Sequence, residues 1–241
     1  MGNDQMNRKF KIKIFADGAD LAGILEMTRN PLISGFTTNP TLMRKAGITD
    51  YEAFAKQVLA EVSRLPISFE VFSDELPDME RQALKISSWA ENVYVKIPAT
   101  NTRGESTRPV VESLARAGVK LNITAMTTPA HIAGMLPVLA GGPPAIVSVF
   151  AGRVADSGRD PVPLMHECLA IIEDTPNIEL LWASPREILN LVQADAIGCQ
   201  IITMTNDLIA KIPLLGKDLD EFALDTVRMF DRDAKAAGFR L

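Results

Sequence analysis

Short apolar runs alternate along the chain with longer segments in which apolar residues recur at helical spacing. The runs have the length of single buried strands and span residues 10–17, 34–39, 67–72, 93–98, 119–124, 145–150, 178–184 and 199–204. The segments between them, such as ITDYEAFAKQVLAEVSRL and SPREILNLVQADA, show the 3.6-residue apolar period of amphipathic helices. Two of these helices are expected to begin at side-chain caps, Thr49 and Ser184.

This alternation predicts an α/β fold with a parallel sheet. About eight strand–helix units in 241 residues favour a single (β/α)8 TIM barrel. The alternative is an open doubly wound sheet, which usually carries a glycine-rich phosphate turn after its first strand. Here that turn reads ADGAD and lacks the GxGxxG spacing. No linker interrupts the pattern, so we expect residues 1–241 to form one barrel domain with a C-terminal helical tail at about 217–241.

The composition of the chain limits the kinds of molecule that the protein is expected to bind. A net charge of −5 argues against a broad nucleic-acid face, although a few local arginines could still hold an anionic small substrate. No window reaches about 18 uninterrupted apolar residues and no secretory signal is evident, so we expect a cytoplasmic protein without a membrane partner. Cys168 and Cys199 lie in apolar surroundings and are expected to be buried and reduced.

Polar side chains cluster near the carboxyl ends of the predicted strands. In a TIM barrel the chemistry gathers at those ends, while the rest of each strand packs in the core. Because strand side chains alternate between faces, Asn122 and Thr124 should point the same way. The strand-end residues are Asp17, Thr37, Asn39, Glu70, Lys96, Asn122, Thr124, Ser148 and Ser184.

Lys96, within VYVKIP, is the most informative of these residues. Lysines are seldom buried, because removing an ammonium from water is costly and usually lowers its pKa. The neutral amine that results is the form that attacks a carbonyl to make a Schiff base. The alternative is a structural lysine that extends to solvent or pairs with a carboxylate.

Five segments that contain these residues resemble, in order, motifs of the transaldolase family, including its short branch with the fructose 6-phosphate aldolases. They are GFTTNPTLM (35–43), NVYVKIPAT (92–100), LNIT (121–124), SVFAGRVAD (148–156) and ASPRE (183–187). The resemblance implies a cofactor-free enzyme without a metal, in which Lys96 forms an imine with a ketose phosphate. Asp17 would take the proton of the C4 hydroxyl during C3–C4 cleavage. Glu70, through a water also held by Thr124, would move protons as the imine forms.

The resemblance also implies a set of side chains that bind the substrate. Asn39 and Asn122 would hold hydroxyls of the retained three-carbon unit. Arg153 and Arg186 would grip the phosphate, for which a guanidinium offers a planar fork of donors. Ser184 would help at a helix N-terminus, where backbone N–H groups are free. The full set is Thr37, Asn39, Asn122, Ser148, Phe150, Arg153, Ser184 and Arg186.

The residues alone leave structural alternatives open. Asp17 before Gly-Ala-Asp could form a turn or a helix cap, and Asn39 before a proline could be turn chemistry. Arg153 could pair with Asp156 on a loop. Ser184 could be a plain N-cap. An ionised Glu70 is harder to explain structurally, because a carboxylate between apolar strand residues needs a partner.

Two positions favour transfer over simple cleavage. The resemblance implies Gln at the position of Glu70 and Tyr at the position of Phe150 in true aldolases, so this chain is more similar to the transferases. The expected reaction exchanges sedoheptulose 7-phosphate and glyceraldehyde 3-phosphate with erythrose 4-phosphate and fructose 6-phosphate, as in the pentose phosphate pathway. A fructose 6-phosphate aldolase that releases free dihydroxyacetone is the alternative.

Other readings stay open. A metal-dependent aldolase would need several histidine ligands, whereas the chain has two, His131 and His166, both in helical segments. A non-catalytic protein that binds sugar phosphates on the same fold is a further alternative. Arg103 and Arg108, just past the lysine strand, could re-charge the site or lie on a solvated loop. The C-terminal tail could pack on its own barrel or reach a neighbouring subunit. Its helix resembles one that members of the short branch use in assembly, so we expect a homo-oligomer.

Overall fold

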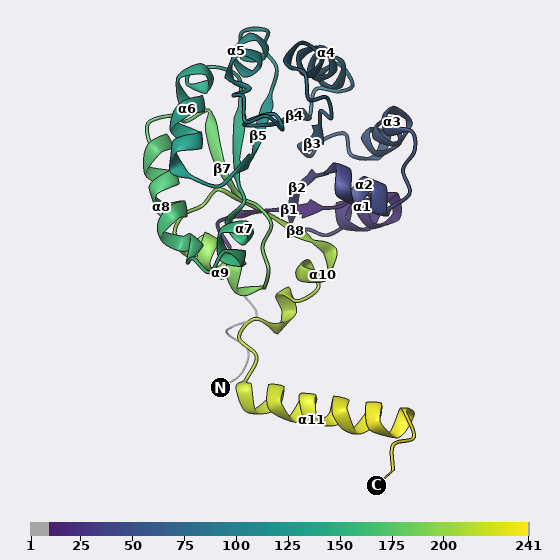
Figure 1. Ribbon diagram of the computed structural model, residues 1–241. Coiled ribbons are helices and arrows are strands. Elements are labelled where there is room, and N and C mark those ends of the chain that lie inside the picture. The colour runs from purple at the N-terminus through teal and green to yellow at the C-terminus, as the bar shows by residue number, and fades with distance from the viewer. Residues whose placement is uncertain (1–9, 241) are drawn as a thin grey trace. The chain divides into compact units, whose positions relative to one another are not determined.

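The computed structural model describes residues 10–240. Eight parallel strands close into a barrel in chain order, with β8 pairing back onto β1 (Figure 1). The strands are β1 (Lys13–Asp17), β2 (Ile33–Thr37), β3 (Ile67–Glu70), β4 (Val93–Pro98), β5 (Leu121–Met126), β6 (Ala145–Val149), β7 (Ile178–Trp182) and β8 (Ile201–Thr205). The predicted (β/α)8 barrel is therefore confirmed, and the open doubly wound sheet is excluded.

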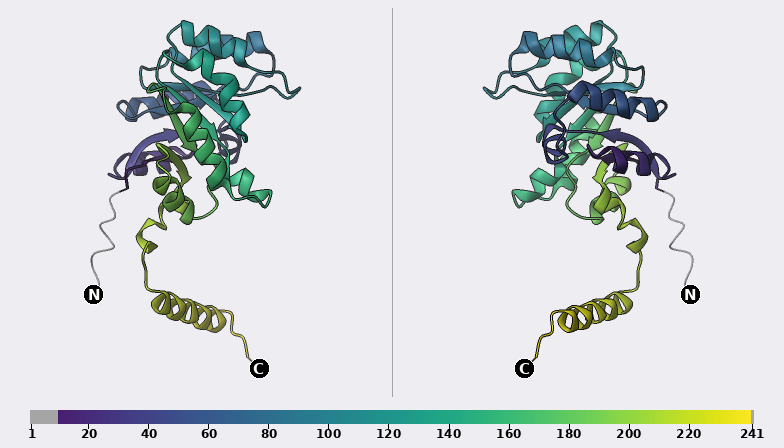
Figure 2. Two further views of the ribbon diagram at one scale, coloured as in Figure 1. Left: turned by 90° about the vertical axis from the view of Figure 1, so that its left-hand side faces the viewer. Right: turned by 90° about the vertical axis from the view of Figure 1, so that its right-hand side faces the viewer.

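Helices connect the strands and lie on the outside of the barrel (Figure 2). Their buried residues recur every three or four positions, as in α3, where Phe54, Ala55 and Val58 face inward. The helices up to residue 209 are α1 (Leu21–Thr28), α2 (Pro40–Lys45), α3 (Tyr51–Glu61), α4 (Leu76–Ser87), α5 (Arg108–Arg116), α6 (Pro129–Leu139), α7 (Ala151–Asp156), α8 (Pro161–Ile172), α9 (Leu189–Ala196) and α10 (Asn206–Ile209).

Side chains from several strands fill the inside of the barrel below its carboxyl end. Phe15 and Ile201 belong to one buried cluster, onto which Tyr94 and Phe150 pack. Gly35 of β2 makes room for this filling, because a Cβ at that position would lie 2.6 Å from ring atoms of Phe15. The interior is thus a packed floor, and the polar strand ends lie above it.

Two predicted caps were wrong. Helix α3 is capped by Asp50 and not by Thr49, because the Asp50 carboxylate accepts a hydrogen bond from the N–H of Ala53. Ser184 caps no helix, since α9 begins only at Leu189. Ser184 instead takes a left-handed conformation, with φ of 60°, in the loop that follows β7.

The residues after Ile209 belong to a second compact unit, described here by itself. It contains a short 3-10 helix, η1 (Ile212–Leu214), and the helix α11 (Leu219–Ala236), which Asp218 caps through the N–H groups of residues 220 and 221. The predicted C-terminal helix is therefore present, whereas the single-domain organisation stays a prediction. None of the helices within residues 10–240 has the length and hydropathy of a membrane span.

Candidate active site

Lys96 and Glu70 form a buried ion pair at the carboxyl end of the barrel. They occupy aligned positions on β4 and β3, and the Lys96 Nζ lies 3.1 Å from the Glu70 Oε2. Nζ also donates to the carbonyl oxygen of Thr38, at 3.1 Å. The two side chains are only 9% and 16% exposed, so most of the water around both charges has been removed. A carboxylate is thus within proton-transfer distance of a shielded amine.

Tyr51, at the start of α3, holds the backbone of Glu70. Strands β2 and β3 pair only through Phe36 with Ile67 and Thr37 with Ser68, so the edge of β3 beyond them has no strand partner. The Tyr51 hydroxyl takes that place: it accepts from the N–H of Glu70 and donates to the carbonyl oxygen of Glu70, each at 2.8 Å. Burial raises the pKa of Tyr51, so the phenol keeps its proton and remains a donor.

Asp17 ends β1 and faces the same cavity. The Thr37 hydroxyl donates to Asp17 Oδ1 at 2.7 Å, and Asn39 Nδ2 lies 3.4 Å from Oδ2. Burial raises the pKa of Asp17 above its ordinary value, while the charge of Lys96 and the two hydrogen bonds oppose that rise. A carboxylate with a raised pKa is a stronger base than one in water, which suits removal of a hydroxyl proton.

A cavity of about 640 Å³ opens at this end of the barrel. Nine of the predicted site residues line it, and with them Thr203 and Thr205 of β8, which the sequence did not single out. The nine are Asp17, Asn39, Glu70, Lys96, Thr124, Phe150, Arg153, Ser184 and Arg186.

The other three predicted residues, Thr37, Asn122 and Ser148, are buried behind the cavity wall. Ser148 donates to Asn122 Oδ1 at 2.6 Å, and Asn122 Nδ2 donates to the Ser68 hydroxyl at 2.9 Å. Asn122 keeps one N–H and one lone pair beyond these two bonds. The Thr37 hydroxyl is bonded to Asp17, so in this structure it positions that carboxylate.

Thr124 presents an uncommitted hydroxyl at the wall of the cavity. Its Oγ1 is buried and has no hydrogen-bond partner among the residues that the structure describes. The next residue, Ala125, has φ of 60°, and the β5–β6 register shifts at the same place. Such strain costs energy and tends to be retained at functional sites. A water or a substrate oxygen would satisfy the Thr124 hydroxyl.

The two arginines at the rim are held differently. Arg186 pairs through Nε and Nη2 with the carboxylate of Asp156, which lowers the pKa of Asp156. The Asn190 side chain accepts from the backbone N–H of Arg186 at 2.7 Å and so orders the loop after β7. Arg153 lies above Phe150, with its guanidinium carbon 5.9 Å from the ring centre. Asp156 therefore pairs with Arg186, and the sequence alternative of a pair with Arg153 is not what the structure has.

Gly152 lets the loop after β7 approach α7. A Cβ on Gly152 would lie 1.6 Å from the carbonyl oxygen of Ser184, closer than any non-bonded contact allows, and 3.4 Å from Nε of Arg186. The absence of a side chain at position 152 therefore permits both the left-handed turn at Ser184 and the place of Arg186.

Arg103 does not reach into the cavity. Its guanidinium forms ion pairs with Asp74, Glu75 and Glu105, and the Arg103 side chain is 46% exposed. Arg108 begins α5 and is exposed. Both residues therefore lie on a solvated surface, which was one of the two sequence alternatives.

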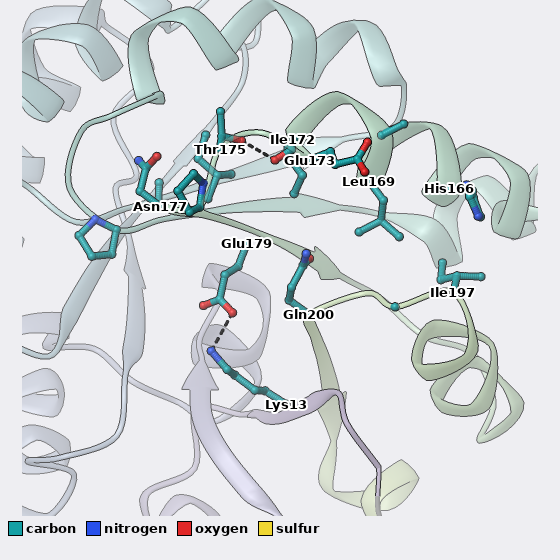
Figure 3. Close-up of a pocket in the computed structure, with 16 residues that line it drawn as sticks. Lys13, His166, Leu169, Ile172, Glu173, Thr175, Asn177, Glu179, Ile197 and Gln200 are labelled. Carbon is teal, nitrogen blue, oxygen red and sulfur yellow. Dashed lines mark hydrogen bonds and ion pairs between the residues drawn. The ribbon is translucent and has the colours of Figure 1, made fainter.

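A second cavity, of about 760 Å³, lies at the opposite end of the barrel (Figure 3). It opens among the amino-terminal ends of β1, β6 and β7 and beside α8, which contributes the exposed His166. The one ion pair drawn there joins Lys13 Nζ to Glu179 Oε1 at 2.7 Å, with the side chains 50% and 32% exposed.

The other histidine, His131 on α6, accepts a hydrogen bond from the N–H of Thr127 and is structural.

Comparison with known proteins shows the family of the chain. A family model described as transaldolase/fructose-6-phosphate aldolase matches residues 14–241. The chain belongs to this family. A probable transaldolase of Dehalococcoides mccartyi is 32% identical over 218 residues, which cover 89% of this chain and 97% of that relative. Probable transaldolase 2 of Listeria monocytogenes is also 32% identical over 218 residues, which cover 89% and 95% of the two chains.

Solved structures support the fold alone. N-acetylneuraminate lyase from Mycoplasma synoviae superposes with a TM-score of 0.56 over 95% of this chain and 80% of that one, at 9% identity.

In this transaldolase-family chain, sequence analysis did not identify Tyr51 and Thr203 as candidate site residues. Tyr51 belongs to a helix, and Thr203 is a β-branched residue of the kind that strands prefer. Their position at the carboxyl end of the barrel was the only available signal.

Proposed function

We propose that the chain is a class I transaldolase, which transfers a dihydroxyacetone unit from a ketose phosphate to an aldose phosphate through a Schiff base on Lys96. The observation that carries the proposal is the shielded Lys96–Glu70 pair, at 3.1 Å, in a cavity that Asp17 also lines. Family membership supports the same chemistry. Fructose 6-phosphate and sedoheptulose 7-phosphate are the proposed donors.

The first half of the reaction builds the imine. Glu70 accepts a proton from Nζ of Lys96, and the neutral amine adds to the C2 carbonyl of the ketose. The carbinolamine hydroxyl then takes a proton from Glu70 and leaves as water. The Thr124 hydroxyl, which has no protein partner among the described residues, is suited to hold that water. The product is an iminium ion on Lys96.

The second half breaks the C3–C4 bond. Asp17 takes the proton of the C4 hydroxyl, the C4–O bond becomes a carbonyl, and the electron pair of C3–C4 moves into the iminium to give an enamine. The shortened aldose phosphate leaves. An acceptor aldehyde enters, the steps reverse, and hydrolysis frees Lys96. No electron acceptor or metal is consumed in this sequence.

The two arginines at the rim of the cavity are proposed to bind the phosphate group of the substrate. Arg153, Ser184 and Arg186 line the same cavity as Lys96. Asp156 binds two of the guanidinium nitrogens of Arg186, which leaves the third free for a phosphate oxygen. Asn39, which lines the cavity, is proposed to hold hydroxyls of the three-carbon unit. Asn122 is fully buried in this structure, so the same role for its one remaining N–H stays a prediction.

Transfer is favoured over release of dihydroxyacetone by the residue that faces the enamine. Phe150 lines the cavity and carries no hydroxyl that could protonate the enamine carbon. The enamine is therefore retained until an aldehyde arrives. The same proposal assigns the enzyme to the pentose phosphate pathway in the cytoplasm.

We also infer a homo-oligomer. Helix α11 exposes large apolar side chains, and exposed apolar surface of this kind usually marks an interface. These side chains are Leu219, Phe222, Leu224, Val227, Met229 and Phe230. The light-scattering mass of the full-length chain tests this part of the proposal, and the mass of a single chain at all concentrations would exclude it.

The deciding experiment traps the imine. The full-length protein is incubated with fructose 6-phosphate, reduced with borohydride and digested for peptide mass spectrometry, with Lys96→Met as the control. A three-carbon adduct on Lys96, with one glyceraldehyde 3-phosphate released per site, is expected. Free dihydroxyacetone formed without an acceptor would favour the aldolase instead. An unmodified Lys96 with both fructose 6-phosphate and sedoheptulose 7-phosphate would overturn the proposal.

A further inference from the structure

Three hydroxyl and carboxyl groups from three neighbouring strands form a connected chain at one side of the cavity. Thr203 of β8, Thr37 of β2 and Asp17 of β1 contribute the groups, and β1 lies between the other two strands in the barrel. The Thr203 and Thr37 hydroxyl oxygens are 2.5 Å apart, and Thr37 Oγ1 is 2.7 Å from Asp17 Oδ1. Thr37 and Thr203 are only 2% and 6% exposed, so water competes little for these bonds.

The number of hydroxyl protons available determines which group donates and which accepts in each of these hydrogen bonds. An ionised carboxylate can only accept, so the single proton of Thr37 goes to Asp17. The Thr37 oxygen must then accept from Thr203, because a hydroxyl has one proton to donate. Thr203 therefore donates to Thr37, and Thr37 donates to Asp17. The chain leaves Asp17 Oδ2, which has only a 3.4 Å contact with Asn39, for the substrate.

We propose that Thr203 is a positioning residue, which aligns the Thr37 hydroxyl on Asp17 and thereby prepares Asp17 to take the proton of the substrate in the cleavage step. The inference rests on the proposed function. Hydrogen bonds in such a chain polarise one another, so the donation from Thr203 makes Thr37 a stronger donor. Without it, the Thr37 hydroxyl can rotate away from Asp17, and Oδ2 is no longer held in one direction.

The hydrogen bonds from Thr203 through Thr37 to Asp17 also affect the pH dependence of cleavage. Burial raises the pKa of Asp17 and the Thr37 hydrogen bond lowers it, so weakening that bond raises the pKa further. Cleavage needs ionised Asp17. Loss of the Thr203 hydroxyl should therefore move the acidic limb of the pH–rate profile for cleavage to higher pH. The charged residues that line the two cavities containing Asp17 keep their charges when Thr203 is replaced by valine. They are Lys96, Glu70, Lys45, Asp20, Asp207, Arg153 and Arg186.

The test separates imine formation from cleavage. Thr203→Val keeps the shape of the side chain and removes its hydroxyl, whereas Thr203→Ser keeps the hydroxyl. Each variant is mixed with fructose 6-phosphate, quenched with borohydride at short times, and scored for six-carbon and three-carbon adducts on Lys96. Thr203→Val should raise the ratio of six-carbon to three-carbon adduct about five- to tenfold, the effect of one lost hydrogen bond. Its KM should stay near that of the wild type.

The controls make the outcome decisive. Thr203→Ser should restore the wild-type ratio and the wild-type acidic limb, while Thr203→Val should shift that limb to higher pH. An unchanged ratio in Thr203→Val, or an equal defect in Thr203→Ser, would overturn the inference. Thr203→Ala is measured in parallel, so that a folding defect of the valine variant cannot decide the result. Absence of any adduct on wild-type Lys96 would instead refute the proposed function, and this inference with it.

Discussion

The two ends of the barrel have cavities of comparable size and opposite character. The cavity at the amino-terminal ends has a volume of about 760 Å³, and the cavity at the carboxyl ends about 640 Å³. Its ion pair, Lys13 with Glu179, is 50% and 32% exposed, whereas Lys96 and Glu70 at the carboxyl end are 9% and 16% exposed. The distances within the two pairs are similar, at 2.7 and 3.1 Å.

Cavity volume and the presence of an ion pair therefore do not distinguish the two ends of the barrel, whereas the exposure of the paired charges does. Water screens the charges of Lys13 and Glu179, so their interaction is weak. At the carboxyl end the charges are shielded, and strained backbone at Ala125 and Ser184 lies beside them. Desolvated charge and strain both cost stability, and both tend to cluster at functional sites.

Among variants that keep Lys96, the largest expected effect comes from crowding the carboxyl end. Gly152→Ala places a Cβ against the Ser184 carbonyl oxygen and must displace the loop that carries Arg186. A displacement of about 1 Å at a substrate-positioning group can cost about 100-fold, and we expect kcat/KM for fructose 6-phosphate to fall by that order. Steady-state kinetics of the purified variant measure it.

A matched glycine serves as the control. Gly134, inside α6, has no atom within 4 Å of an added Cβ, so Gly134→Ala should leave kcat/KM unchanged and favour the helix slightly. Trapping with dihydroxyacetone, which has no phosphate, should modify Lys96 equally in Gly152→Ala and the wild type. Unimpaired kinetics of Gly152→Ala with fructose 6-phosphate would show that the Ser184 loop does not position the substrate.

A smaller effect should follow removal of the Tyr51 hydroxyl. Tyr51→Phe keeps the ring but leaves the N–H and C=O of Glu70 without their partner, so the carboxylate loses its fixed place near Lys96. We expect kcat to fall about tenfold and the free energy of unfolding to fall by about 1–2 kcal/mol. Kinetics and urea unfolding give the two numbers.

The other tyrosine of the chain, Tyr94, provides the comparison. It packs on the core of the barrel, so Tyr94→Phe should change kcat much less than Tyr51→Phe. Equal losses of activity in the two variants would mean that general packing, rather than the clamp on Glu70, explains the effect.

The smallest effect is expected at the amino-terminal end. Lys13→Met removes an exposed pair and should change the free energy of unfolding by less than about 1 kcal/mol, with kcat/KM and the yield of Lys96 adduct unchanged. Lys96→Met, by contrast, should abolish the adduct. A marked loss of activity in Lys13→Met would end the distinction between the two cavities.

The alternation of strand and helix patterns predicted the barrel, and the resemblance to the transaldolase family supplied most of the candidate site residues. All eight strands appear near their predicted places, and Asp17, Glu70 and Lys96 face one cavity because parallel strands end on the same side. Cys168 and Cys199 are free and buried, as predicted. The roles assigned to the site residues stay predictions until they are measured.

The features that the sequence did not predict depend on tertiary contacts, which no local sequence pattern contains. Tyr51 reaches β3 only because β2 diverges from it, and the cap at Ser184 failed because the loop after β7 turns left-handed against Gly152. Thr203 gains its partner from β2, 166 residues away in sequence. Residues of these types are common in helices, turns and strands, so their identity alone carries little information.

The hydrogen bonds around Asp17 depend on closure of the barrel. Lys96 and Glu70 come from adjacent strands that follow each other along the chain. Asp17 is completed only when β8, the last strand, docks beside β1. The proposed cleavage step, which uses Asp17, therefore depends on contact between the first and last strands, whereas the Lys96–Glu70 pair spans only two neighbouring strands.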